Sequence, residues 1–195
     1  MQYSSQKIGL SGRQQRIKHR GCVIWLTGLS GAGKSTIAIE LKRSLVQRGC
    51  QVCILDGDNI RRGLCSDLGF SRKDRRENNR RIGEMAKIFA ETGFICITAF
   101  ISPYRTDRAI VRHIMTEGQF IEVFVNAPLA ICEARDPKGL YAKARNRQIK
   151  KFTGISAPYQ LPLRPEIELR TDKLSITGTV EKIMKYLKAL HVLNI

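Results

Sequence analysis

The sequence predicts an α/β fold in which a parallel sheet of about five strands is flanked by helices. Apolar runs of strand length alternate along the chain with segments of helical periodicity. A glycine-rich stretch joins the first apolar run to the first helical segment. In sheets of this kind ligands bind beyond the carboxyl ends of the strands, so residues that directly follow strands are expected to share one crevice.

The glycine-rich stretch, residues 28–35, reads GLSGAGKS and matches the G-x-x-x-x-G-K-[ST] pattern of a phosphate-binding loop. Its glycines lack a Cβ, so the backbone can turn its N–H groups around an anion. Lys34 adds a mobile charge for the β- and γ-phosphates, and the Ser35 hydroxyl is placed to bind Mg²⁺. A chance match in a glycine-rich turn is the alternative, but a buried strand precedes the loop and a helix follows it. We therefore expect a nucleoside triphosphate, ATP, to contact Gly28, Leu29, Ser30, Gly31, Ala32, Gly33, Lys34, Ser35 and Thr36.

Periodicity and turn residues place the remaining elements. The apolar runs predict strands at residues 22–26, 51–55, 94–101, 120–125 and 166–169. Helical spacing and capping signals predict helices at residues 34–48, 71–91, 106–115, 128–134 and 179–190. The first of these helices carries an apolar stripe of Ile37, Leu41, Leu45 and Val46. The segment from about 138 to 153 is rich in Lys and Arg and cannot bury itself, so a surface helix or lid is expected there.

The helix predicted at 71–91 changes character along its length. Ser71 can cap it, and the apolar stripe of its second half leads back to Asn78 and Arg75 in its first half. The second half is expected to lie on the core, while the first half overlooks something polar. The alternative, which we weigh equally, is that the first half of this helix is simply exposed to solvent.

Length and composition limit the class of protein. The 195 residues suggest one domain, 21–195, preceded by a basic arm, residues 1–20. The net charge of +17 fits an anionic partner, either nucleic acid or small polyanions such as nucleotides, and composition alone does not select between them. No apolar stretch approaches the ~18 residues of a membrane span. The basic, Ser-containing start resembles a transit peptide, but we favour a short arm on a cytoplasmic protein with six reduced cysteines.

Polar residues follow several predicted strands. Asp56 and Asp58, Ser102 and Asn126 all come directly after apolar runs and are expected to share the crevice with the phosphate-binding loop. The D-G-D triplet is also a good turn former, so a purely structural role is the alternative. Together with a cationic lid, these groups predict a kinase that acts on a small anionic acceptor.

Several longer motifs make the chain resemble the adenylylsulfate (APS) kinase family. They read GLSGAGKS, DGDNIRRGLCSDLGF, RRENNRRIGEMAK, TAFISPYR, FIEVFVNAPLAICEARDPKGLYAKAR and FTGI, and they extend from about Arg20 to the C-terminus. The resemblance implies transfer of the γ-phosphate of ATP to the 3′-hydroxyl of adenosine 5′-phosphosulfate (APS), which yields 3′-phosphoadenylylsulfate. It also implies Mg²⁺, a role in sulfate assimilation and a homodimer, with no nucleic-acid or membrane partner.

The resemblance further implies which residues act. Arg61 and Arg75 can pair with phosphosulfate oxygens. Phe70 and Phe152 can sandwich the adenine ring, although each phenylalanine taken alone fits core packing. From their places at the phosphate site, Lys34 and Asp56 are expected to be catalytic, Asp56 by aiding Mg²⁺ coordination or by deprotonating the 3′-hydroxyl, and Ser102 is the third catalytic position. The implied APS contacts are Asp58, Arg61, Phe70, Arg75, Asn78, Ile101, Ser102, Lys138 and Phe152.

Ser102 is the position that the family associates with a phosphoserine intermediate. No base-like side chain is adjacent to it in the sequence, so we favour direct transfer with Ser102 as a ligand contact. Three positions depart from the family pattern and bear on the charge and dynamics of the lid region: Arg62, Lys151 and Gln160.

Two other readings stay open. The first is another small-acceptor kinase with the same loop, such as a nucleoside or sugar-acid kinase. The second is a nucleic-acid-binding regulatory ATPase, which the +17 charge alone suggests and which predicts salt-sensitive binding of DNA or RNA.

Overall fold

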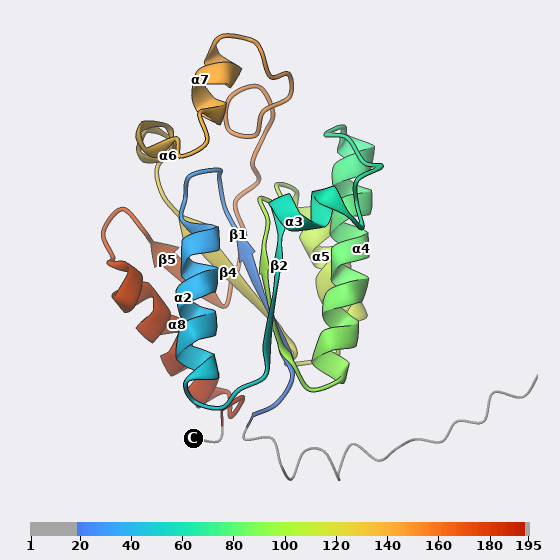
Figure 1. Ribbon diagram of the computed structural model, residues 1–195, viewed down its shortest axis with the longest axis vertical. Coiled ribbons are helices and arrows are strands. Elements are labelled where there is room, and N and C mark those ends of the chain that lie inside the picture. Colours follow the sequence, from blue (N-terminus) through green and yellow to red (C-terminus); the bar gives the residue numbers. More distant parts are fainter. Residues whose placement is uncertain (1–18, 194–195) are drawn as a thin grey trace, which may run out of the picture.

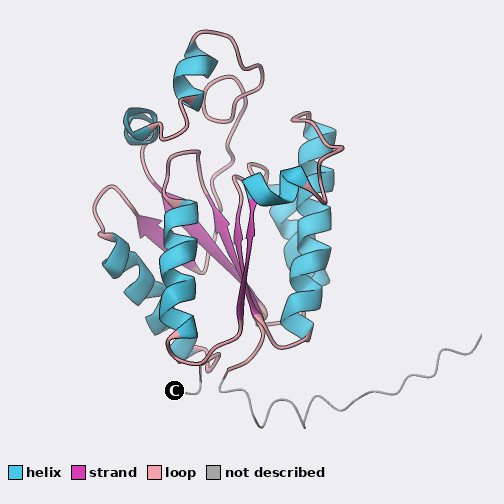
Figure 2. Cartoon of the chain, viewed as in Figure 1, coloured by secondary structure: helices cyan, strands magenta, loops and turns pink. Residues whose placement is uncertain are grey.

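A five-stranded parallel sheet lies between two layers of helices in the computed structural model, which describes residues 19–193 (Figure 1, Figure 2). The strand order is β2-β3-β1-β4-β5, and every neighbouring pair is parallel. This confirms the predicted fold class. The strands are β1 (Cys22–Thr27), β2 (Val52–Asp56), β3 (Ile95–Ala99), β4 (Phe120–Asn126) and β5 (Ile167–Arg170).

The helices divide between the two faces of the sheet. Helices α2 (Lys34–Val46) and α8 (Ile176–Ala189) cover one face, and α4 (Arg72–Glu91) and α5 (Arg105–Ile114) cover the other (Figure 1). Strand β1 is buried along its whole length, because it is central and has helices on both sides. This explains why its sequence is continuously apolar rather than alternating.

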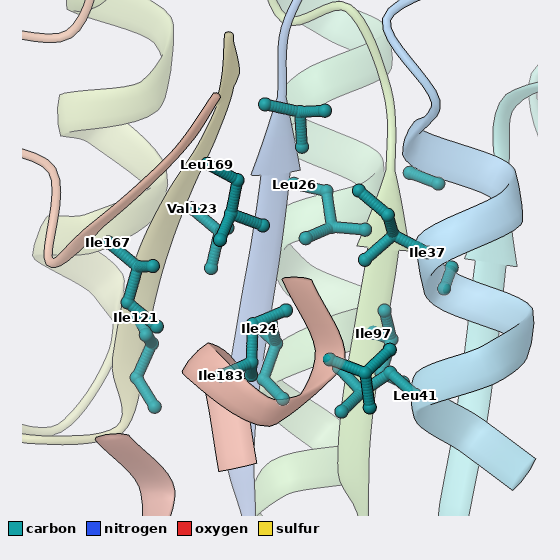
Figure 3. Close-up of a cluster of buried hydrophobic side chains, with 14 of the residues drawn as sticks. Ile24, Leu26, Ile37, Leu41, Ile97, Ile121, Val123, Ile167, Leu169 and Ile183 are labelled. Atoms are coloured by element: carbon teal, nitrogen blue, oxygen red, sulfur yellow. The ribbon is translucent and has the colours of Figure 1, made fainter. Parts of the chain in front are cut away.

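Each face of the sheet has its own core. Figure 3 shows the larger one, in which Ile24, Leu26 and Ile97 of the sheet meet Ile37 and Leu41 of α2. On the opposite face, side chains of the sheet pack against helices α4 and α5, and this second core includes Val23, Trp25, Ile82, Ala86 and Val111. The sheet is therefore held rigidly, and the loops at its carboxyl edge extend from a fixed base.

Capping chemistry sets several helix boundaries. The Ser71 hydroxyl accepts from the backbone N–H of Asp74 at 3.1 Å, and an Asp74 carboxylate oxygen accepts from the backbone N–H of Ser71 at 3.2 Å, so a capping box starts α4 where the sequence predicts. At α8 the prediction is three residues late. The Ser175 hydroxyl accepts from the Gly178 N–H, and the helix begins at Ile176.

One local prediction is wrong, and one short helix was not predicted. Val46 is 50% exposed, because α2 ends there and its side chain lies outside the apolar stripe. The segment after β2 is not only a turn: a short helix, α3 (Gly57–Arg62), begins directly after the strand. Asp56 caps this helix, because its carboxylate accepts from the Asp58 N–H at 3.0 Å. The same aspartate-to-backbone hydrogen bond also occurs in isolated turns, so the sequence alone did not distinguish a helix from a turn here.

The basic lid segment projects beyond the carboxyl edge of the sheet (Figure 1). It follows the short helix α6 (Leu129–Arg135), contains α7 (Leu140–Arg145), and continues into a turn closed by a bridge between Thr153 and Ala157. Of the predicted basic arm, residues 1–18 lie outside the described part of the chain. Within the described part, no helix combines the length and apolar character that crossing a bilayer requires.

Candidate active site

A cavity of about 1180 Å³ lies at the carboxyl edge of the sheet, between the phosphate-binding loop, α3, the start of α4 and the lid. It brings together side chains that are far apart in the sequence. This agrees with the expectation that residues directly following parallel strands share one crevice, which we call the strand-end rule. Of the residues predicted to act in catalysis or to contact ATP or APS, all but Gly28 and Leu29 line it: Ser30, Gly31, Ala32, Gly33, Lys34, Ser35, Thr36, Asp56, Asp58, Arg61, Phe70, Arg75, Asn78, Ile101, Ser102, Lys138 and Phe152.

The phosphate-binding loop adopts a backbone that only glycine accommodates easily. Gly31 has a φ of 72°, and a Cβ there would lie 2.7 Å from the Cys132 carbonyl oxygen. Gly33 has a φ of 101° and forms the N-cap of α2. The positive end of the α2 dipole and its free N–H groups therefore border the cavity, an arrangement that favours an anion.

Lys34 is held by this loop. Its ammonium donates to the carbonyl oxygens of Gly28 at 3.0 Å and Leu29 at 2.7 Å, so these two residues take part through their backbone. Burial lowers the pKa of Lys34 to about 8, since the charged form loses its hydration. A phosphate anion placed beside the ammonium would favour its charged form.

Two aspartates at the end of β2 have different partners. The Ser35 hydroxyl donates to one Asp56 carboxylate oxygen at 2.8 Å, which joins α2 to the strand end. Asp58 forms an ion pair with Lys138 of the lid, 80 residues further along the chain. Asp56 therefore faces the phosphate-binding loop, whereas Asp58 connects α3 to the lid across the cavity.

An aromatic ring flanked by two guanidinium groups forms another wall. The Phe70 ring is 59% exposed, with the guanidinium carbon of Arg61 at 4.4 Å and that of Arg75 at 5.7 Å from its centroid. Arg61 donates to the carbonyls of Leu68 and Gly69 at 3.1 Å each. Partial burial lowers the pKa of both arginines, yet both stay protonated because the pKa of arginine starts far above neutral. This wall combines a stacking face with fixed positive charge.

The remaining walls contain two buried side chains with contrasting surroundings. Asn78 is 5% exposed, and within residues 19–193 its side-chain oxygen has no hydrogen-bond partner although it borders the cavity. A ligand donor would satisfy that oxygen. Phe152 is 8% exposed and packs edge-on against Tyr141, with ring centroids 5.0 Å apart. It therefore belongs to the core and to the cavity wall at once, whereas Phe70 is open to solvent.

Ser102 is held in a strained position. It has a φ of 38°, unusual for a residue with a side chain, and it is 3% exposed. The Trp25 indole donates to its hydroxyl oxygen at 3.1 Å, and Arg108 donates to its carbonyl oxygen at 2.7 Å. Within the described part of the chain, no carboxylate or imidazole is hydrogen-bonded to this hydroxyl.

One predicted residue lies elsewhere, and one wall was missed. Asn126 does not line the cavity, because its amide turns along the sheet and donates to Glu168 at 2.7 Å. The missed wall consists of Arg135 and five residues after β5: Thr171, Leu174, Ser175, Ile176 and Thr179. Arg135 donates to the Thr171 carbonyl at 2.7 Å, and the Thr171 hydroxyl donates to the Ala32 carbonyl at 2.9 Å. The strand-end rule points to Thr171, because it directly follows β5, but no local motif marks Arg135.

Known proteins resemble this chain in sequence and in fold. A family model described as adenylylsulphate kinase matches residues 20–170. The chain is 56% identical to the probable adenylyl-sulfate kinase of Halalkalibacterium halodurans, over 91% of this chain and 88% of that one, and 54% identical to the adenylyl-sulfate kinase of Vibrio parahaemolyticus, over 93% and 89%. Among solved structures, the APS kinase CysC of Mycobacterium tuberculosis in complex with AMPPNP and APS is similar, with a TM-score of 0.83 and 43% identity over 87% of this chain and 99% of that one. The chain therefore belongs to the adenylylsulphate kinase family.

Proposed function

We propose that this protein is an adenylyl-sulfate kinase that transfers the γ-phosphate of ATP to the 3′-hydroxyl of APS and yields 3′-phosphoadenylylsulfate for sulfate assimilation. One observation carries the proposal. A single continuous cavity joins a phosphate-binding loop to a wall with an exposed aromatic ring, two arginines and an unsatisfied buried amide oxygen. We assign one side of that cavity to the donor nucleotide and the other side to the acceptor nucleotide.

The donor half is the loop with the start of α2. Its N–H groups and the α2 dipole suit the β- and γ-phosphates, and Lys34 supplies a positive charge that needs no rearrangement of the backbone. The residues assigned to ATP are Gly28, Leu29, Ser30, Gly31, Ala32, Gly33, Lys34, Ser35 and Thr36. Thr171, Leu174 and Ile176 border the same half and suit the nucleoside part.

The oxygen donors present fit Mg²⁺, a hard cation that takes oxygen ligands. The Ser35 hydroxyl and the Asp56 carboxylate lie 2.8 Å apart beside the phosphate-binding loop, and we assign the ion to them. When bound, the ion would neutralise charge that develops on the phosphate oxygens. Asp56 also accepts the Asp58 N–H, so the carboxylate keeps its orientation without the ion.

The acceptor half is assigned to APS. Phe70 offers a stacking face for adenine and Phe152 a second apolar wall, while Arg61 and Arg75 offer charge for the phosphosulfate. The Asn78 oxygen can accept from the adenine amino group. Asp58, Ile101, Ser102 and Lys138 complete the assigned contacts.

We favour direct transfer between the two nucleotides. The Ser102 hydroxyl receives the Trp25 N–H and has no adjacent base among the described residues, so its arrangement suits a ligand contact better than an activated nucleophile. Asp56 is the carboxylate nearest the phosphate-binding loop by its Ser35 contact, and it is assigned either the metal or the 3′-hydroxyl proton. When the lid is closed, it excludes water from the cavity, and its lysine and arginine side chains balance the charge of the phosphates.

A coupled assay with ATP, Mg²⁺ and APS tests the proposal directly. We expect ADP formation that depends on APS and a product that comigrates with 3′-phosphoadenylylsulfate. Nucleosides and sugar acids in the same assay test the other kinase reading, and RNA tests the regulatory ATPase. ATP hydrolysis that rises with RNA but not with APS would show that the kinase proposal is wrong.

We also propose a homodimer in the cytoplasm, which rests on the family resemblance. Light scattering coupled to size-exclusion chromatography measures the mass, and a monomer or a higher oligomer would contradict the dimer.

A further inference from the structure

Two basic residues of the lid have backbone conformations that favour glycine. Arg147 and Lys151 both have a φ of 59°. Left-handed conformations are costly for residues with a Cβ, and such residues often mark functional positions. Of the two residues, Lys151 lines the cavity and Arg147 does not.

The backbone around Lys151 is fixed from both sides. The Arg75 guanidinium donates to the Lys151 carbonyl at 3.0 Å, which ties the lid to α4. On the other side, the Ser156 hydroxyl accepts from the Phe152 N–H at 3.0 Å, and the Phe152 carbonyl accepts from the N–H groups of the following turn. The left-handed turn at 151 is therefore imposed by its surroundings, and glycine would satisfy it with less strain.

Among the described residues, the Lys151 side chain has no partner that explains its presence. Within residues 19–193, no hydrogen bond or ion pair reaches its ammonium, and the residue is exposed at the cavity wall. Its neighbours belong to the acceptor half: Arg75 also donates to the Phe70 carbonyl at 3.1 Å, and the buried Thr153 hydroxyl has no hydrogen-bond partner among the described residues. A free cation, an unsatisfied hydroxyl and an exposed ring thus border one side of the cavity.

From this we infer that Lys151 is an additional anion-binding residue of the acceptor half, which contacts the phosphosulfate of the sulfonucleotide and increases its affinity. The inference deepens the proposed function and rests on it. The ammonium is exposed, so its attraction is screened by salt and acts on binding rather than on the chemical step.

Four variants test the role of Lys151. Lys151→Gly and Lys151→Asn remove the charge, and both residue types tolerate a left-handed backbone. Lys151→Arg keeps the charge. Arg147→Gly is the matched control, because it relieves the same backbone strain in the same segment at a position outside the cavity wall.

The expected results separate charge from backbone strain. Lys151→Gly and Lys151→Asn raise the KM for APS about three- to fivefold at low ionic strength, with kcat and the KM for ATP unchanged. This increase shrinks as salt is added, because the parent loses the attraction. Lys151→Arg and Arg147→Gly keep the parent KM. Both glycine variants leave the melting temperature unchanged or raise it by up to about 3 °C.

Titration of the ADP-loaded protein with APS measures affinity without turnover. Equal KM values in parent and Lys151→Gly, or equal shifts in Lys151→Gly and Arg147→Gly, would overturn the role of Lys151 while leaving the kinase proposal intact. A parent that neither binds APS nor phosphorylates it would instead refute the proposed function, and the role of Lys151 with it.

Discussion

The phosphate-binding loop and the lid border the same cavity but are built differently. The loop is anchored between β1 and α2, its lysine is buried, and its geometry depends on glycines and backbone carbonyls. The lid is largely exposed and is tied to the rest of the molecule by side-chain contacts such as Lys138 with Asp58 and Arg75 with the Lys151 carbonyl. The loop is therefore a rigid base, whereas the exposed part of the lid is held across the cavity by a few side-chain contacts.

This difference has a functional meaning. Charge stabilisation in phosphoryl transfer benefits from groups that do not reorganise, which the loop provides. Entry of an acceptor and exclusion of water need a segment that moves, which the lid provides. We therefore expect substitutions in the loop to affect the chemical step most, and substitutions in the lid to affect mainly the binding of APS.

The largest effect is expected for Lys34→Ala. Loss of a preorganised cation beside the transferred phosphate should lower kcat/KM by about 10³-fold, measured in the coupled assay. Lys42→Ala is the matched control, because Lys42 lies exposed on the same helix outside the cavity wall. Similar losses in both variants would show that the effect comes from α2 and not from the site.

Asp56→Asn should lower kcat by about 10²-fold and raise the Mg²⁺ concentration needed for half-maximal rate, because the carboxylate faces Ser35. Asp58→Asn is the comparison, and it should raise the KM for APS without changing the Mg²⁺ dependence. Near-normal turnover of Asp56→Asn with ATP still bound would contradict its assigned role.

Affinity for ATP should depend on pH through Lys34. Burial lowers its pKa to about 8, and bound phosphate favours the ammonium, so ATP binding takes up a proton above that pH. The affinity should therefore be level below about pH 7 and fall about tenfold between pH 7 and 9. Fluorescent nucleotide titrations would measure it. Lys34→Arg keeps its charge over this range and should show a flat profile; an equal decline in that variant would assign the effect to another group.

The smallest effect is expected for the lid. Lys138→Ala should raise the KM for APS, because it removes a cation from the acceptor half. The increase should be only about fivefold, because the ammonium is exposed and screened by solvent. The melting temperature should stay unchanged, since both partners of the Lys138–Asp58 pair are solvated. Lys143→Ala in α7 removes an exposed lysine outside the cavity wall and should match the parent. A large loss of kcat in Lys138→Ala would place the lid in the chemical step and weaken the contrast between the two regions.

The strands, the capped helix at Ser71 and the phosphate-binding loop could be predicted from the sequence, because each depends on local signals. Apolar runs of strand length, a capping residue and glycines at fixed spacing act within a few residues of one another. The strand-end rule also placed Asp56, Asp58 and Ser102 in one crevice. It was wrong for Asn126, because the rule places a residue at the edge of the sheet but says nothing of where its side chain turns.

By itself the sequence determined the layered fold and the loop that suits a phosphate, since both follow from local periodicity and from glycine conformations. Tertiary structure alone decided which distant side chains meet. Arg75 reaches a carbonyl 76 residues away, Lys138 pairs with an aspartate 80 residues away, and Thr171 closes the opposite wall. Contacts of this kind depend on strand order, crossover connections and side-chain packing, and none of these is encoded in any short stretch of residues.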